Sequence, residues 1–361
     1  MTISIVPMFV AVYFNYRFAA DGILDNKKEN LQALVLRQAN EINQFFTATQ
    51  LMANNLADSQ PAREIIIPFA NATASDISQI PHSPAFLAYQ SKWGERINYY
   101  GNNQDFSQVY VANLNGIVLY GAGHRGLSLF DLHAPPASSL AISPLYDQVV
   151  KTRQVCTSGM TIQTPDHLPG FYFGAPVFQQ NSKTVLIGVA MAELDDNRLQ
   201  TVLNNRIGLG DTGETMVFAC DEGKFTIVNR PYFRPTAMFT SVTPLSGTTA
   251  FGDGITPPGQ ALVAEGLGYR GHDVVAAWTY LPSLNWVLLQ KVDQEEVFAP
   301  VYALRNFSLG LGLVTLLLVV AIAALVARNI TRPVVLLTSI AERIAHGDLT
   351  IPVTSGERNE I

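Results

Sequence analysis

The most distinctive pattern in the chain is an uninterrupted apolar run from Asn306 to Ala327, which reads NFSLGLGLVTLLLVVAIAALVA. It contains no charged residue, and Arg305 and Arg328 bracket it. A helix of about 22 residues at about 1.5 Å per residue spans roughly 33 Å, enough to cross a hydrocarbon core of about 30 Å. A core helix of this length would normally show a polar face. The run therefore predicts a transmembrane helix over 306–327.

A second apolar stretch lies at the amino terminus, where Thr2 to Asn15 (TISIVPMFVAVYFN) carries no charge. About 14 residues are few for a complete span. A cleavable signal peptide would have a basic start, and no basic residue stands beside Met1. We interpret residues 1–16 as a first transmembrane helix that is truncated at its beginning.

Between these segments the spacing of apolar residues changes from that of a helix to that of strands. Apolar residues recur at three, four or seven positions from Leu31 to Leu56, which predicts a long helix over 20–60 ending near Pro61. A hairpin pattern around Asn115-Gly116 follows, and a similar pattern recurs further along the chain. The predicted strands lie within 107–120, 170–177 and 184–194, and then within 216–228, 273–281 and 285–292, with a short helix over 195–205 between the two sets. The fold class is α+β, with two modules of antiparallel sheet in series.

Composition and motifs exclude several classes of function. Hydrophobic residues are 48% and charged residues 14%, which suits a chain partly in lipid, and a net charge of −6 gives no basic face for nucleic acid. Two cysteines, Cys156 and Cys220, are too few for a disulfide framework. The six histidines show no metal-ligand spacing, and there is no HExxH, CxxC or GxSxG motif. We predict no catalytic residue, metal or cofactor.

One glycine motif has the letters of a dinucleotide-binding fingerprint. Gly208 to Gly213 reads GLGDTG, but a helix is predicted before it and a strand after it. Nucleotide binding requires the opposite order, because the phosphates are held at the amino terminus of the following helix. We interpret the motif as a turn between the two modules.

Several segments, taken in order, resemble the double Cache family of sensor domains. They are the long leading helix, VYVANLNGIVLY, GFYFGAPV, GLGDTGETMVF and YRGHDVVAAWTYLPSLNWVLLQKVDQEEVFAPV, and the resemblance covers roughly residues 20–304. It implies two tandem PAS-like modules outside the membrane, a distal module over 61–206 and a proximal module over 207–304.

The resemblance also implies a ligand pocket in the distal module, between the sheet and the segment that covers it. The matching positions are Tyr110, Tyr120, Arg125, Tyr146, Asp166, His167 and Tyr172. Each could equally be an ordinary core aromatic or turn residue. Family members that bind amino acids carry an Arg-x-Trp-Tyr motif followed by Tyr-x-Asp, and this chain has neither, so the sequence does not support an amino acid ligand.

The segment after the transmembrane run resembles the first helix and connector of a HAMP domain. Residues 328–361 read RNITRPVVLLTSIAERIAHGDLTIPVTSGERNEI, with an apolar stripe spaced as in a coiled coil. Pro333 suits a first helical turn, and Glu360 matches the acidic start of the second HAMP helix. The residues expected to relay a signal are Pro333, Leu337, Ile340, Ile344 and Glu360. No output domain follows, so this end is expected to be truncated as well.

These resemblances imply a homodimeric receptor in the bacterial inner (plasma) membrane, with a periplasmic sensor and a cytoplasmic HAMP segment. Its partner would be a small molecule or a ligand-loaded binding protein, and its output a histidine kinase or chemotaxis signalling. A receptor feeding a nucleotide cyclase or phosphatase shares these modules. A membrane-anchored extracytoplasmic enzyme is the alternative from a different class, and it would require a catalytic constellation.

Overall fold

The computed structural model divides into two compact units. The sheet unit is Leu24–Val297, and the helical unit combines Met1–Ile23 with Phe298–Ile361. Helices α1 (Thr2–Ala57) and α6 (Gln294–Val326) each continue from one unit into the other. The structure describes residues 2–101, 105–123, 128–135, 137, 141–162, 169–182, 184–221, 224–242 and 256–345.

Within the sheet unit, α1 buries a single stripe of side chains. Leu31, Val35, Ile42 and Leu56 are fully buried, as their helical spacing predicts. Phe46 also faces the interior and is buried. Through this stripe α1 packs into the core of the sheet unit.

The long helix ends earlier than the sequence predicted. It stops at Ala57, and Ser59 then caps a separate short helix, α2 (Gln60–Ile66), by accepting a hydrogen bond from the Ala62 amide. Pro61 lies in the first turn of α2, where its missing N–H costs no helical hydrogen bond. The proline therefore begins a helix here.

The first sheet has six antiparallel strands and is covered by helices on both faces. After α2 come three short 3-10 turns, η1 (Ile67–Phe69), η2 (Ala74–Asp76) and η3 (Ile80–His82), and then α3 (Pro84–Gly101). A further helix, α4 (Ile142–Thr152), lies between the third and fourth strands in sequence. In spatial order the strands are β3 (Phe130–Asp131), β2 (Ile117–Gly123), β1 (Phe106–Asn113), β6 (Leu186–Leu194), β5 (Pro169–Phe178) and β4 (Cys156–Ile162).

The second sheet repeats this topology. Helix α5 (Asp196–Leu203) leads from β6 towards it, and η5 (Pro235–Ala237) is a short turn within it. Its strands in spatial order are β9 (Ser241–Val242), β8 (Lys224–Ile227), β7 (Glu214–Asp221), β12 (Trp286–Asp293), β11 (Asp273–Leu281) and β10 (Leu262–Leu267). Each strand of the second sheet occupies the place that the strand numbered six lower occupies in the first sheet. This repeat confirms the predicted fold of two tandem antiparallel modules.

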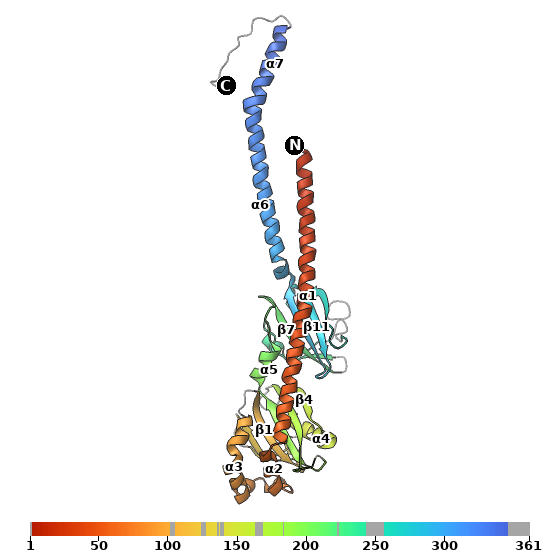
Figure 1. Ribbon diagram of the computed structural model, residues 1–361, viewed down its shortest axis with the longest axis vertical. Coiled ribbons are helices and arrows are strands. Elements are labelled where there is room, and N and C mark those ends of the chain that lie inside the picture. Colours follow the sequence, from red (N-terminus) through yellow and green to blue (C-terminus); the bar gives the residue numbers. More distant parts are fainter. Residues whose placement is uncertain are drawn as a thin grey trace. The chain divides into compact units, whose positions relative to one another are not determined.

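Helix α1 packs against both sheets (Figure 1). The Phe46 ring lies 5.0 Å from Phe171 of β5 and 5.3 Å from Trp286 of β12, measured between ring centroids. About two turns earlier along the buried stripe, the Gln38 side chain donates to the Leu203 carbonyl at 3.0 Å and accepts from Gln290 of β12. A single helix thus holds the two sheets in one core.

The helical unit contains the predicted transmembrane segment. Among the residues that the structure describes, one helical stretch, 294–342, is long and apolar enough to cross a membrane. It comprises α6, a π-helical turn η6 (Ala327–Thr331) and α7 (Arg332–Ala345). Pro333 is in the first turn of α7 and Leu337 is exposed on that helix. Ile340 is half-buried on α7, whereas the Ile344 side chain and Glu360 lie outside what is described.

Candidate functional site

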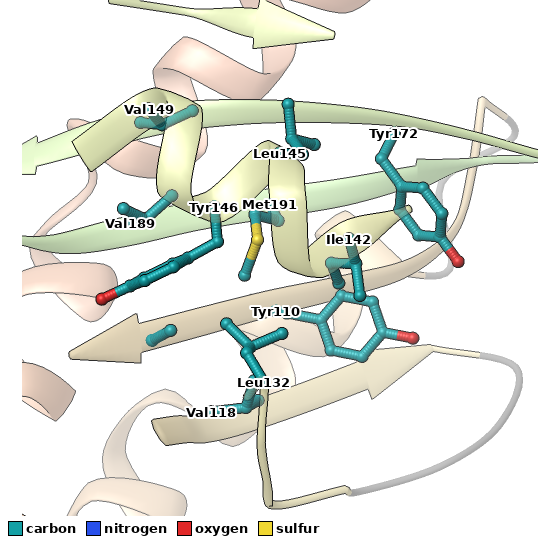
Figure 2. Packing of buried hydrophobic residues seen from close by; sticks show 11 residues of the cluster. Tyr110, Val118, Leu132, Ile142, Leu145, Tyr146, Val149, Tyr172, Val189 and Met191 are labelled. Atoms are coloured by element: carbon teal, nitrogen blue, oxygen red, sulfur yellow. The ribbon is translucent and has the colours of Figure 1, made fainter. Parts of the chain in front are cut away.

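Helix α4 packs on one face of the first sheet and forms a core that contains three of the predicted site residues, Tyr110, Tyr146 and Tyr172 (Figure 2). Gly174 of β5 allows this close packing, since a Cβ there would lie 2.8 Å from a Val149 methyl carbon of α4. The opposite face of β5 carries Phe171 and Phe173, which contact Phe46 of α1. The buried cluster under α4 comprises Tyr110, Ala112, Val118, Leu132, Ile142, Leu145, Tyr146, Val149, Tyr172, Val189 and Met191.

Three of the four predicted site tyrosines belong to this cluster, but their hydroxyl groups point in different directions. Those of Tyr110 and Tyr172 lie towards the same end of the cluster, whereas that of Tyr146 points to the other end (Figure 2). The Tyr146 hydroxyl donates to the Asn113 carbonyl at 2.7 Å and accepts from the Gly116 amide at 3.1 Å. Burial raises the pKa of Tyr146 to about 12. Tyr146 therefore stabilises the β1–β2 turn.

Tyr120 lies on the opposite face of the sheet. A β-bulge in the β1–β2 pair makes Val111 pair with Tyr120 and Ala112 with Val118, so Leu119 is an extra residue. The bulge breaks the alternation that would have put Tyr120 beside Val118. The Tyr120 ring packs 5.5 Å from that of Tyr89 of α3. It is thus separated from the residues under α4.

Two polar residues that the sequence analysis missed lie beside Tyr172. Glu193 of β6 pairs with Gln108 on one side and with Tyr172 on the other, and directly paired side chains on one face are about 5 Å apart. Gln108 is 0% exposed, Glu193 5% and Tyr172 1%. Tyr110 belongs to the next row of the same face. We call Gln108, Tyr172 and Glu193, together with Tyr110 of the adjacent row, the polar row.

A sequence signal for the polar row does exist. Gln108 and Tyr110 are two apart on β1, as are Met191 and Glu193 on β6, so each pair lies on one face. A carboxylate in the otherwise apolar strand LIGVAMAEL is unusual, because burying a charge is costly unless a partner compensates it. This outlier could have marked the face that carries the site.

The second sheet carries an ion pair at the corresponding place. Glu214 of β7 and Lys291 of β12 are paired across the strands, and their side chains approach to 3.2 Å. The Tyr269 hydroxyl donates to the Glu214 carboxylate at 2.9 Å, and Lys291 Nζ lies 3.7 Å from the centre of the Tyr269 ring. Burial lowers the pKa of Lys291, although Glu214 opposes the shift. These charges are compensated within the protein.

Three predicted site residues, Arg125, Asp166 and His167, lie outside the described residues, and their part in a site stays a prediction. Among the residues that are described, no group of three His, Cys, Asp or Glu side chains could hold a metal ion. In that same part of the chain, Cys156 and Cys220 are free thiols.

The chain thus combines two tandem sheets on a common helix with a helix long and apolar enough to cross a membrane. The chain belongs to the double Cache family: the family model, described as a Cache domain, matches residues 19–301. A second model, described as a HAMP domain, matches residues 325–361. This combination is that of a transmembrane sensory receptor.

The sheet unit is similar to several solved sensory domains. The sensory domain of the Campylobacter jejuni chemoreceptor Tlp3 is 13% identical with a TM-score of 0.49, and covers 78% of this chain and 99% of its own. The ligand-binding domain of the Pseudomonas aeruginosa amino acid chemoreceptor PctB, in complex with L-Arg, is 15% identical with a TM-score of 0.48, and covers 81% and 99%. At these identities the likeness is one of fold.

A curated relative is the transducer protein CosT of Halobacterium salinarum. It is 30% identical over 147 residues, which are 41% of this chain and 17% of the relative. This chain thus matches less than a fifth of the length of that protein.

Proposed function

We propose that the module built on the first sheet binds a small ligand at the polar row and that the receptor signals to a chemotaxis or histidine kinase output. The observation that carries this proposal is the row of buried polar side chains, Gln108, Glu193 and Tyr172, on the sheet face that also carries the apolar cluster under α4. Binding pockets typically combine a few orienting polar groups with apolar and aromatic walls. The cluster under α4 provides such walls.

The second module is the weaker candidate for the ligand. At its corresponding position Glu214 and Lys291 compensate each other, and Tyr269 packs on both. A ligand there would have to displace an internal ion pair, and breaking a buried pair costs about 3–5 kcal/mol.

The chemistry of the polar row suits a ligand with hydrogen-bonding groups. A carboxylate such as that of Glu193 can accept about four hydrogen bonds, and the Gln108 amide can donate and accept. Charge-assisted hydrogen bonds in a buried setting are stronger than neutral ones. The hydroxyls of Tyr110 and Tyr172 would orient the remainder of the ligand.

The relay runs along α6 into the membrane and the HAMP segment of a parallel homodimer in the inner membrane, with the sheet unit in the periplasm. A ligand drives such a change only through its differential affinity for two states, and shifts of about 1–2 Å between packed helices are typical. Disulfide crosslinking at Ile340 and Ile344 in membranes tests the dimer. Crosslinks at neither position would contradict a HAMP dimer.

Ligand binding is tested by a thermal-shift screen of the full chain in nanodiscs against a panel of amines, amino acids, carboxylates and sugars. A hit is then titrated by calorimetry against the wild type and Glu193→Gln. We expect Glu193→Gln to weaken the hit at least tenfold, while Tyr120→Phe, on the other face, leaves its affinity unchanged. Unchanged affinity in a folded Glu193→Gln and in Gln108→Ala would exclude the polar row as the site.

A further inference from the structure

The glycine turn Gly208–Gly213 binds a carboxylate of the chain itself. The amides of Asp211 and Thr212 donate to the Glu296 carboxylate at 3.0 Å and 2.7 Å, and the Thr212 hydroxyl donates to it as well. Glu296 is in the first turn of α6. The turn thus holds an acidic side chain with two consecutive backbone N–H groups, an arrangement that suits anions.

Gly210 is the glycine of this turn that makes room for the carboxylate. Gly210 has a φ of +88°, which other residues rarely adopt, and a Cβ at this position would lie 2.0 Å from a Glu296 carboxylate oxygen. Gly210 therefore provides both the backbone conformation and the space for the carboxylate. Gly210 thus serves an internal anion in place of a nucleotide phosphate.

The other side of the turn is fixed by Arg206. Its guanidinium donates to the carbonyl of Gly213 at 2.7 Å and to that of Asp211 at 2.8 Å. Because these carbonyls are held by the arginine, the neighbouring amides face Glu296. The Thr212 hydroxyl also accepts from the amide of Asp293, the last residue of β12, at 3.1 Å.

The turn lies in the sequence between the first sheet and the second. Strand β6, which carries Glu193 of the polar row, leads through α5 directly to the turn, and the turn leads into β7. The Asp195 side chain caps α5 by accepting from the Arg198 amide at 2.9 Å. The end of β6 is therefore separated from the turn by the short helix α5 and the few residues after it.

We propose that the Glu296 carboxylate is a positioning residue for signal relay: it couples the turn that follows the first module to the first turn of the helix that enters the membrane. This proposal rests on the proposed function for its biological meaning. A change at β6 that moves α5 shifts the turn, and the hydrogen bonds to Glu296 carry that shift to α6. Without the carboxylate the turn keeps its hydrogen bond to Asp293 at the end of β12 but loses its direct hydrogen bonds to the first turn of α6.

The test measures amide hydrogen exchange in the full chain in nanodiscs and needs no ligand. Glu296→Gln is compared with Glu295→Gln, which removes the same charge from an exposed neighbour in the same helical turn. We expect Glu296→Gln to speed exchange at Asp211 and Thr212 by about tenfold or more, as the loss of hydrogen bonds to a charged group implies. Glu295→Gln should leave this exchange within about twofold.

Coupling is tested by adding Asp195→Ala, which removes the α5 cap, to each background. In the wild type and in Glu295→Gln it should speed exchange in the first turn of α6 severalfold, and in Glu296→Gln it should add nothing. An equal effect in all three backgrounds would overturn the coupling role, as would unchanged Asp211 and Thr212 exchange in Glu296→Gln. A failure of the polar row to bind ligand would leave both results intact, so the two proposals fail separately.

Discussion

Replacing Phe46 with alanine is expected to destabilise both sheets together. Phe46 is 5% exposed, and its ring lies within about 6 Å of Phe171, Phe173 and Trp286, which come from two different sheets. Truncating a buried phenylalanine costs about 3–5 kcal/mol of unfolding free energy, the cavity included. Its contacts with three aromatic rings place this site towards the upper end of that range. Because one side chain fills space for both sheets, the loss is shared between them.

The assay combines urea unfolding of the full chain with hydrogen exchange of β5 and β12 amides. The matched control is Phe45→Ala, which truncates the adjacent, half-buried ring and should cost about 1–2 kcal/mol less because its ring contacts Phe46 alone among the described aromatic pairs. We expect protection to fall in β5 and β12 alike. Equal costs for the two variants, or loss of protection in one sheet only, would refute the view that α1 joins the sheets through Phe46.

Three further predictions concern buried polar groups. Tyr146→Phe removes a hydroxyl that serves both the Asn113 carbonyl and the Gly116 amide, and urea unfolding should show a loss of about 1–3 kcal/mol. Lys291→Met leaves Glu214 buried without its counter-charge and should cost about 3–5 kcal/mol, much of which the double variant with Glu214→Gln should restore. Burial alone would raise the pKa of Glu296, but hydrogen bonds from the turn and the charge of Lys27 lower it overall. Its contribution to stability is therefore complete above about pH 4.3 and is lost as the pH falls through the folded-state value; unfolding of the wild type and Glu296→Gln from pH 7 to 3 should converge in acid.

The sequence missed four strands, β3, β4, β9 and β10, and all four are edge strands. An edge strand contacts one neighbour and buries fewer side chains, so β10 alternates only between exposed and half-buried positions. Its apolar pattern is correspondingly weak. The inner strands β1, β5, β6, β11 and β12 are buried along most of their length, and their patterns predicted them within a few residues.

The candidate site was harder to predict than the strands that form it. The resemblance to double Cache sensors pointed to tyrosines in the correct module, but the bulge at Leu119 put Tyr120 on the far face, and the Tyr146 hydroxyl is bound to the β1–β2 turn. A bulge leaves no reliable mark in the pattern, because one inserted residue changes alternation by a single step. Glu193 was visible as an outlier, yet only strand register placed it beside Tyr172.

The sequence by itself determined the membrane-crossing helix, the tandem repeat and the resemblance to a receptor, because each depends on the order and period of residues along the chain. Tertiary structure alone decided which residues meet. The motif Gly208–Gly213 shows the difference: its letters match a nucleotide site, and the helix before it and the strand after it argued against one, but nothing in the local sequence indicated that Glu296, more than 80 residues later, is the anion it holds. Contacts between distant segments depend on how the sheets pack, and local periodicity carries no information about that packing.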